Sequence, residues 1–264
     1  MKKNISGFEI IIKDNYLEIC KEAACIIKDQ IESNPTSVLG LATGSTPLGI
    51  YSILIDYYKN EKLDFSKTKS FNLDEYYPID NKNINSYNHY MNENLFNDIN
   101  IKKENINIPN GLANEPKDEC ILYDKKIQDA GGIDIQLLGI GLNGHIGFNE
   151  PSDFFCKNTH LVKLDESTIK ANSRFFDNYE SVPKYAITMG IKAIFESKKI
   201  ILVVSGKEKA NILSELLYGE ISPKIQASIL QLHKNTVIIA DKEATIKIIQ
   251  PFWINIKGLY YYYY

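Results

Sequence analysis

The sequence predicts an α/β fold with a mostly parallel sheet covered by helices on both faces. Apolar runs of strand length alternate with segments of helix length along the chain. Several of the apolar runs end directly in polar loops, which is typical of the carboxyl ends of strands in open α/β sheets. A chain of 264 residues is long enough for one such domain with a sizeable core.

Strands are expected where short apolar runs occur, and helices fill the longer segments between them. The strands are predicted at residues 8–12, 38–41, 68–72, 133–138, 161–164, 200–204 and 237–240. The helices are predicted at residues 16–31, 47–59, 86–96, 118–130, 207–217 and 242–249. No repeat or Pro/Gly/Ser-rich linker interrupts this alternation, so residues 1–259 are predicted to form a single domain. Residues 260–264 are all tyrosine, and this tail has no chemical role that the sequence suggests.

Composition argues against several classes of protein. The formal charge of −3 and the pI near 5.9 give no electrostatic footprint for nucleic acid or an anionic membrane. No run approaches the roughly 18 apolar residues of a membrane-spanning helix, and the N-terminus lacks the apolar core of a signal peptide. The cysteines are Cys20, Cys25, Cys120 and Cys156. Without CxxC spacing they are interpreted as reduced thiols of a cytoplasmic protein, and the dispersed histidines suggest no metal site.

The segment VLGLATGSTPLGIY, which begins at residue 38, predicts a strand followed by a small polar turn. The turn consists of Thr43, Gly44, Ser45 and Thr46. Thr46 is a good N-cap, and Pro47 is suited to the first helical position. Free backbone N–H groups and the positive end of a helix make such a turn an anion site. The alternative is an ordinary capped helix start, since the GK[ST] of a Walker A loop is absent.

The segment FNLDEYYP places two acids, Asp74 and Glu75, directly after the strand predicted at residues 68–72. Adjacent acids in a loop are usually only solvated. A catalytic role gains weight because an acid at this strand end would converge on the same crevice as the histidine of the next motif.

The segment LGIGLNGHIGFNEP, at residues 138–151, carries a histidine and a carboxylate where another buried strand ends. His145 and Glu150 lie on either side of Gly147, which lets the chain turn. A histidine titrates near neutral pH and a carboxylate can orient it, so the pair suits proton transfer. The alternative is that His145 is structural or merely exposed.

The same segment also spells GxGxxG at Gly139, Gly141 and Gly144, with Asp165 at about the distance of a ribose-binding acid. A dinucleotide site is therefore a competing interpretation. It requires a helix that opens at Gly144, and the glycine and proline that follow would break such a helix.

Arg174 is the only arginine among the 30 basic residues of this lysine-rich chain. The planar fork of arginine binds a phosphate through two parallel hydrogen bonds, which lysine does not. The alternative is the chance survival of one arginine. Lys209, in the strand–turn–helix pattern VVSGKEKAN, is a further candidate cation, and Lys207 competes with it for that role.

Four motifs, in order, strongly resemble those of the glucosamine-6-phosphate deaminases. They are ATGSTP, FNLDEYYP, GLNGHIGFNEP and ANSRFF…VPKYAITMG, and the resemblance continues to about NIKGL. It implies a Rossmann-like fold that converts glucosamine 6-phosphate and water to fructose 6-phosphate and ammonia, with no cofactor or metal. It also implies that residues 152–185 form a mobile lid over the sugar, a segment called the lid segment below.

The resemblance implies a role for each matching residue. Asp74 would move the proton between C2 and C1 of the opened sugar, and His145, oriented by Glu150, would assist ring opening. Asn143 stands where many relatives have an aspartate in this relay. The residues implied to hold the phosphate are Thr43, Gly44, Ser45, Thr46, Arg174 and Lys209.

Two alternative functions compete with the deaminase interpretation. The related 6-phosphogluconolactonases share the fold, but Asp74 together with GHIGFNEP favours the deaminase. A sugar-phosphate sensor would need a DNA-binding module, for which the expected first strand leaves no room. His160 and Val162 stand where regulated deaminases tend to have basic side chains. We therefore expect weak or absent allosteric activation and either a monomer or a homo-oligomer.

Overall fold

The computed structural model describes residues 1–176, 178–249, 255–256 and 259–260. Residues 261–264 of the tyrosine tail lie outside the described residues. Within the described part, the main sheet has eight strands in the order β1-β2-β11-β10-β7-β3-β4-β6. They are β1 (Lys2–Ile5), β2 (Phe8–Lys13), β3 (Val38–Leu41), β4 (Lys69–Asn72), β6 (Ile106–Asn107), β7 (Ile135–Leu138), β10 (Lys199–Val204) and β11 (Thr236–Asp241). All neighbours pair in parallel except β1 with β2, so the predicted mostly parallel sheet is confirmed.

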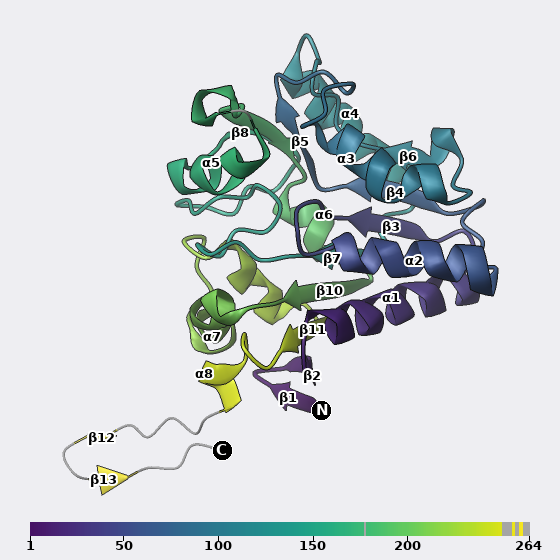
Figure 1. The fold of residues 1–264 in the computed structure, drawn as a ribbon. Helices are drawn as coiled ribbons and strands as arrows, with labels where there is room; N and C mark the ends of the chain where they lie inside the picture. The colour runs from purple at the N-terminus through teal and green to yellow at the C-terminus, as the bar shows by residue number, and fades with distance from the viewer. Residues whose placement is uncertain (177, 250–254, 257–258, 261–264) are drawn as a thin grey trace.

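Helices cover both faces of the main sheet, as predicted (Figure 1). One face packs against α1 (Tyr16–Ser33), α2 (Leu48–Glu61) and α3 (Tyr87–Asn94). The other packs against α4 (Pro116–Asp129), α6 (Ile191–Phe195), α7 (Ala210–Tyr218) and α8 (Ile246–Ile249). Each interface is a separate cluster of buried aliphatic and aromatic side chains, because a sheet with two apolar faces needs cover on each. Of the helices in the described part, none combines the length and the apolar character that crossing a membrane requires.

A second, antiparallel sheet of β5 (Asp74–Tyr77), β9 (Tyr185–Thr188) and β8 (His160–Lys163) accompanies the main one. The strand predicted at residues 161–164 exists, but it belongs to this small sheet and not to the parallel one. The strands β3 and β10 point towards the side on which β8 and α5 (Glu166–Asn172) lie (Figure 1). The small sheet and α5 therefore stand beyond the carboxyl ends of the parallel strands.

Shorter elements complete the described part of the chain. The 3₁₀ helices are η1 (Phe96–Asp98), η2 (Lys103–Asn105), η3 (Ser173–Phe175), η4 (Tyr179–Ser181), η5 (Lys207–Lys209) and η6 (Gln226–Leu232). Near the C-terminus, β12 (Asn255–Ile256) pairs with β13 (Leu259–Tyr260).

The starts of α3 and α4 lie within two residues of the prediction, and three other helix starts differ for reasons that the structure shows. The helix α2 begins at Leu48 with Pro47 at the cap position and no side-chain cap, so the N-cap role predicted for Thr46 is wrong. The helix predicted from residue 242 begins only at Ile246, because the Asp241 carboxylate accepts the Ala244 N–H at 2.8 Å and holds a turn there. The helix predicted from residue 207 begins as the 3₁₀ turn η5 and becomes α-helical at Ala210.

The sheet order places a topological switch point between β3 and β7. After β2 the chain crosses to β3 and moves outward through β4 and β6, then returns to β7 and continues through β10 to β11. The loops after β3 and β7 therefore leave the sheet side by side and diverge, which opens a crevice at their carboxyl ends. The polar strand ends singled out in the sequence all belong to β10, β7, β3 and β4, which are consecutive in the sheet.

Candidate active site

A cleft of about 980 Å³ opens at these carboxyl ends. The residues predicted for the site that line it are Thr43, Gly44, Ser45, Thr46, Asp74, Asn143, His145, Arg174 and Lys209. Glu150 lies behind this lining, in contact with His145. The structure thus brings together segments that are far apart in the sequence. It also adds aromatic side chains that the sequence did not single out, among them Tyr16, Tyr87 and Tyr90.

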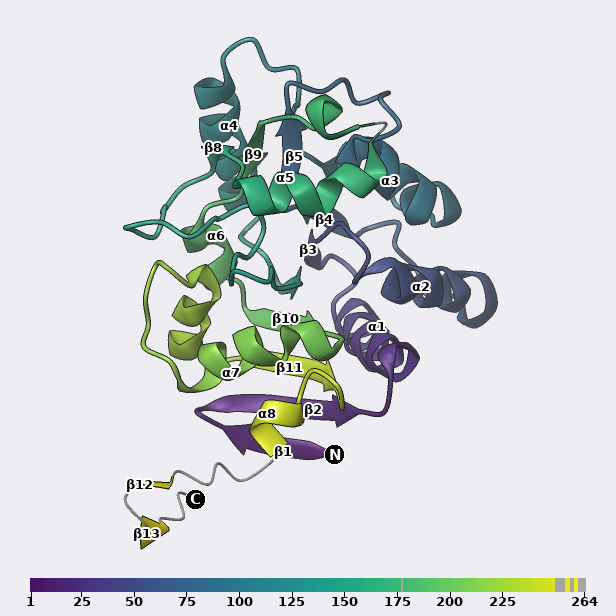
Figure 2. The same cartoon turned by 60° about the vertical axis from the view of Figure 1, so that its left-hand side comes forward.

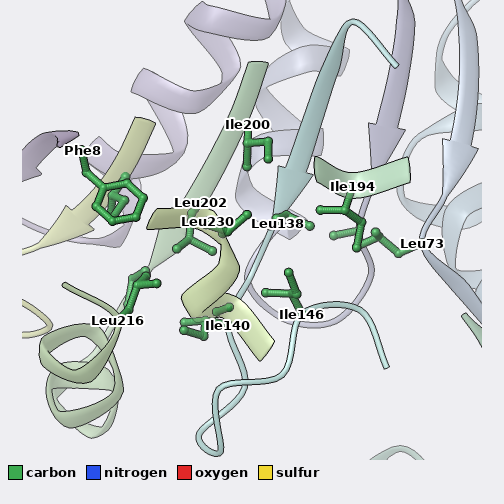
Figure 3. Packing of buried hydrophobic residues seen from close by; sticks show 14 of the residues in the cluster. Phe8, Leu73, Leu138, Ile140, Ile146, Ile194, Ile200, Leu202, Leu216 and Leu230 are labelled. Carbon is green, nitrogen blue, oxygen red and sulfur yellow. The ribbon is translucent and has the colours of Figure 1, made fainter. Parts of the chain in front are cut away.

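The loop that carries His145 is anchored from below by the hydrophobic core. Ile140 and Ile146 are buried, and both point into the cluster that contains Leu138 and Leu73 (Figure 3). Because Ile146 follows His145 directly, burying one side chain fixes the backbone from which the other projects into the cleft.

Two further features of this loop decide the position of the His145 ring. The Gly141 N–H donates to the His145 carbonyl at 2.9 Å, and a Cβ at Gly141 would lie 2.5 Å from the ring. The glycine is therefore needed for close approach. No helix opens at Gly144, which sits in a turn with φ of 84°, so the segment lacks the helix that the dinucleotide interpretation requires.

Glu150 is the centre of a small polar network. Its Oε2 lies 3.3 Å from His145 Nδ1, within ion-pair distance but without hydrogen-bond alignment. The Asn143 amide donates to the same Oε2 at 2.9 Å, and the Thr168 hydroxyl donates to Oε1 at 2.5 Å. Burial raises the pKa of Glu150, but the interactions with His145, Thr168 and Asn143 outweigh it and leave the pKa below its usual value. Glu150 is therefore held as a carboxylate that can orient the imidazole.

Asp74 is a buried carboxyl group that faces the cleft. It is the first residue of β5, only 5% exposed, and within the described part of the chain no group donates a hydrogen bond to its side chain. Burial, and secondarily the neighbouring charge of Glu75, raises the pKa of Asp74 to about 8. A carboxylate with a pKa near neutrality is well matched to take up and return a proton.

Glu75 points away from the cleft, because successive side chains on a strand lie on opposite faces. It is 1% exposed and accepts the backbone N–H groups of Tyr87 and Asn88 at 2.8 Å each, at the start of α3. Burial raises its pKa to about 7 despite these bonds. The two adjacent acids of the motif therefore differ in role: Asp74 lines the cleft and Glu75 anchors a helix.

The polar turn after β3 is held by two tyrosines from distant helices. Tyr90 donates to the Gly44 carbonyl at 2.6 Å, and the Tyr16 hydroxyl lies 3.1 and 3.0 Å from the carbonyls of Ser45 and Thr46. Gly44 has φ of 96°, which favours glycine. With the carbonyls fixed, the backbone N–H groups of residues 44–46 have no acceptor among the described residues. They are available to an anion.

Two cationic side chains also line the cleft, Lys209 and Arg174. Lys209 lines it, and its Nζ donates to the Ile140 carbonyl at 2.7 Å. Burial lowers the pKa of Lys209, the neighbouring charge of Glu208 opposes this shift, and the more weakly acting charge of Arg174 adds to it. Lys209 and Arg174 therefore both bring positive charge to the cleft, which also contains the Glu208 carboxylate. Lys207 does not line the cleft, so the geometry favours Lys209 of the two lysines.

Among the described residues, no group of three or more His, Cys, Asp or Glu side chains is placed to hold a metal ion. The cleft brings together a carboxyl group of raised pKa, a histidine next to a carboxylate, and backbone N–H groups without acceptors among the described residues.

The fold and the cleft agree with the class that comparison with known proteins gives. The chain belongs to the family described as glucosamine-6-phosphate isomerases/6-phosphogluconolactonase, whose profile matches residues 14–239. It is 57% identical over 239 residues to a glucosamine-6-phosphate deaminase of Clostridium botulinum (strain Langeland), across 90% of this chain and 98% of that protein. It is 55% identical to a glucosamine-6-phosphate deaminase of Clostridium novyi, across 91% of this chain and all of that protein.

Solved structures show the same relationship. A monomeric glucosamine-6-phosphate deaminase superposes with a TM-score of 0.88 at 45% identity, over 90% of this chain and 99% of that one. A 6-phosphogluconolactonase from Thermotoga maritima superposes with a TM-score of 0.70 at 21% identity, over 88% and 99% of the two chains. The similarity to the 6-phosphogluconolactonase shows a shared fold.

Proposed function

We propose that this chain is a glucosamine-6-phosphate deaminase, an enzyme that converts glucosamine 6-phosphate and water to fructose 6-phosphate and ammonia. The observation that carries the proposal is a cleft lined by a buried carboxyl group, a histidine next to a carboxylate, a polar turn with free N–H groups and two cationic side chains. The identity of 57% to a deaminase over nearly the whole chain supports the same activity.

The cationic end binds the phosphate in this proposal. Residues 44–46, Arg174 and Lys209 all line the cleft, which supports this assignment. Backbone N–H groups and a guanidinium suit the oxygens of a phosphate monoester. Holding this end fixes C1 and C2 of the sugar at the other end, where the proton transfers occur.

His145 assists the opening of the pyranose ring by moving a proton at the ring oxygen. Glu150 and Asn143 hold the imidazole in position through the contacts at Glu150 Oε2. The open-chain form carries an aldehyde at C1 and the amino group at C2, as the isomerisation requires.

Asp74 then removes the proton from C2 while the aldehyde oxygen at C1 takes up a proton, which gives an enolamine, and Asp74 returns its proton to C1. The amino group becomes an iminium at C2, and water adds to that carbon and displaces ammonia, leaving the ketone of fructose 6-phosphate. One water is consumed and one ammonia released, with no net change in oxidation state. Burial supports this role because it raises the pKa of Asp74 to about 8, near that of a base that must both take and give a proton.

The proposal extends to the domain organisation, the lid segment, the oligomeric state and the location of the protein. Residues 1–259 form one domain, and the lid segment closes over the sugar and excludes water. The relative solved as a monomer supports a monomer here, with a homo-oligomer as the alternative. The four cysteines are all free thiols, which supports a cytoplasmic location.

The test is the release of ammonia and fructose 6-phosphate from glucosamine 6-phosphate without added metal. Equimolar products are expected from the wild type, and Asp74→Asn should lower kcat by roughly 10²–10⁴-fold, the usual contribution of a general base. Asp129→Asn, which alters an exposed carboxylate paired with Lys125, is the matched control and should remain active. A folded wild type that instead hydrolyses 6-phosphogluconolactone would identify the other activity of the family.

A further inference from the structure

The two oxygens of Glu150 have partners from different parts of the chain. Oε2 contacts His145 and Asn143, which belong to the same loop as Glu150. Oε1 accepts its hydrogen bond from Thr168, which lies on α5 within the lid segment. One carboxylate thus joins the loop that carries the histidine to the segment that covers the cleft.

The hydrogen bond from Thr168 is partly buried at the edge of the cleft. Thr168 is 5% exposed, and the side chain of Glu150 is 9% exposed. A bond to an ionised acceptor is stronger than a neutral one, and water does not easily replace a lost donor at a buried position. The position of Glu150 therefore depends on where α5 lies.

The helix α5 is seated on the loop that carries the histidine. Its residue Ile169 is buried in a cluster with Phe148 of that loop and Leu164 of the lid segment. The same helix continues directly into η3, which carries Arg174. In Figure 2, α5 runs across the upper half of the molecule. Thr168 and Arg174 are therefore carried by one continuous helical segment, and both line the cleft.

We propose that Thr168 is a positioning residue that makes the alignment of His145 depend on the placement of the lid segment. When Arg174 engages the substrate phosphate, the helical segment is held over the cleft, and the Thr168 hydroxyl fixes Glu150 and through it the imidazole. Binding energy from the phosphate, which takes no part in the chemistry, is then used to assemble the proton-transfer pair. This inference rests on the proposed deaminase function and extends it.

The test compares two substitutions of Thr168 in the full-length chain. Thr168→Val keeps the shape of the side chain and removes the hydroxyl, and it should lower kcat by roughly ten- to a hundredfold with KM changed by less than about threefold. Thr168→Ser keeps the donor and should retain kcat within about threefold. Ser181→Ala is the control and should match the wild type. It removes a hydroxyl of the lid segment whose partner among the described residues is the nearby Asn178.

A double-mutant cycle with Arg174→Ala tests the dependence on the lid segment. If phosphate engagement places α5, Thr168→Val should lower kcat less in the Arg174→Ala background than in the wild type. Independent, multiplying effects would overturn the coupling.

Other outcomes separate this inference from the proposed function. A wild type that releases no ammonia would refute the function and the inference with it. An active wild type with an equally active Thr168→Val variant would refute the inference alone. Equal losses in Thr168→Val and Thr168→Ser would do the same, because they would assign the effect to packing and not to the hydroxyl.

Discussion

Replacing Asp74 by Asn should make the fold more stable at alkaline pH although it removes most of the activity. The reason is that a buried carboxyl group without hydrogen-bond donors is costly to ionise. Asp241 offers a matched comparison, because both side chains are 5% exposed. The Asp241 carboxylate accepts hydrogen bonds from Ser205 Oγ at 2.6 Å, Gly206 N at 3.0 Å and Ala244 N at 2.8 Å. The same substitution should therefore have opposite effects at the two positions.

The magnitude follows from the pKa of Asp74, which rises from 3.8 to about 8 on folding. The folded state then binds the proton more tightly than the unfolded state, so the contribution to stability is complete below about pH 4 and is lost as the pH rises to about 8. Asparagine does not ionise and loses nothing over this range. At about 1.4 kcal/mol per pH unit, the stability of Asp74→Asn relative to the wild type should grow by roughly 3 kcal/mol between pH 5.5 and pH 9.

The assay is urea unfolding of the wild type, Asp74→Asn and Asp241→Asn at several pH values from 5.5 to 9. Asp241→Asn should be less stable than the wild type throughout, by about 1–3 kcal/mol, because its amide would face a group that donates. A stability difference for Asp74→Asn that stays constant with pH would refute the reasoning. So would destabilisation of this variant at pH 9, since either result means that the carboxylate is solvated or paired.

Three further predictions concern the cleft. Lys209→Ala should raise KM for glucosamine 6-phosphate by roughly ten- to a hundredfold, because Lys209 lines the cleft, and Lys207→Ala should leave KM unchanged. Initial rates measure both values, and equal effects on KM would contradict the placement of Lys209 in the cleft. Gly147→Ala should cost about 1–2 kcal/mol of stability and lower kcat, because φ at this position is 58° and a Cβ would lie 3.1 Å from Thr188 Oγ1 and 3.4 Å from Asp74 Oδ2. An unchanged melting temperature and rate would contradict this prediction. Glu75→Gln should lower the pKa of Asp74, because it removes a neighbouring charge. The limb of the pH–rate profile that reports Asp74 should then move to lower pH. An unmoved limb would exclude this coupling.

Several features of the site could be predicted because their signals are local. His145 and Glu150 belong to one loop, so their contact at 3.3 Å needs only the turn that Gly147 permits. The polar turn at Gly44 was likewise recognisable from a strand end followed by small polar residues. The cap at Thr46 was wrong, although the pattern fits one, because the chain enters α2 through Pro47 without a side-chain cap.

Other features depend on contacts between segments far apart in the sequence. Tyr16 and Tyr90 hold the polar turn from α1 and α3, and neither has a neighbouring motif that would mark it. The link from Thr168 to Glu150 has the same character. The strand β5 was missed because, among the described residues, its one partner strand is β9, which follows it by more than a hundred residues in the chain.

The sequence by itself determined the alternation of strands and helices, the polar strand ends and the motifs of the family. These depend on periodicity and on residues close to one another in the chain, where burial and backbone preference act locally. The tertiary structure alone decided which of Asp74 and Glu75 faces the cleft and which of Lys207 and Lys209 enters it. The physical reason is that neighbours on a strand point to opposite faces and residues in a helical turn point in different directions. Only the packing of distant elements settles which face becomes the wall of a cleft.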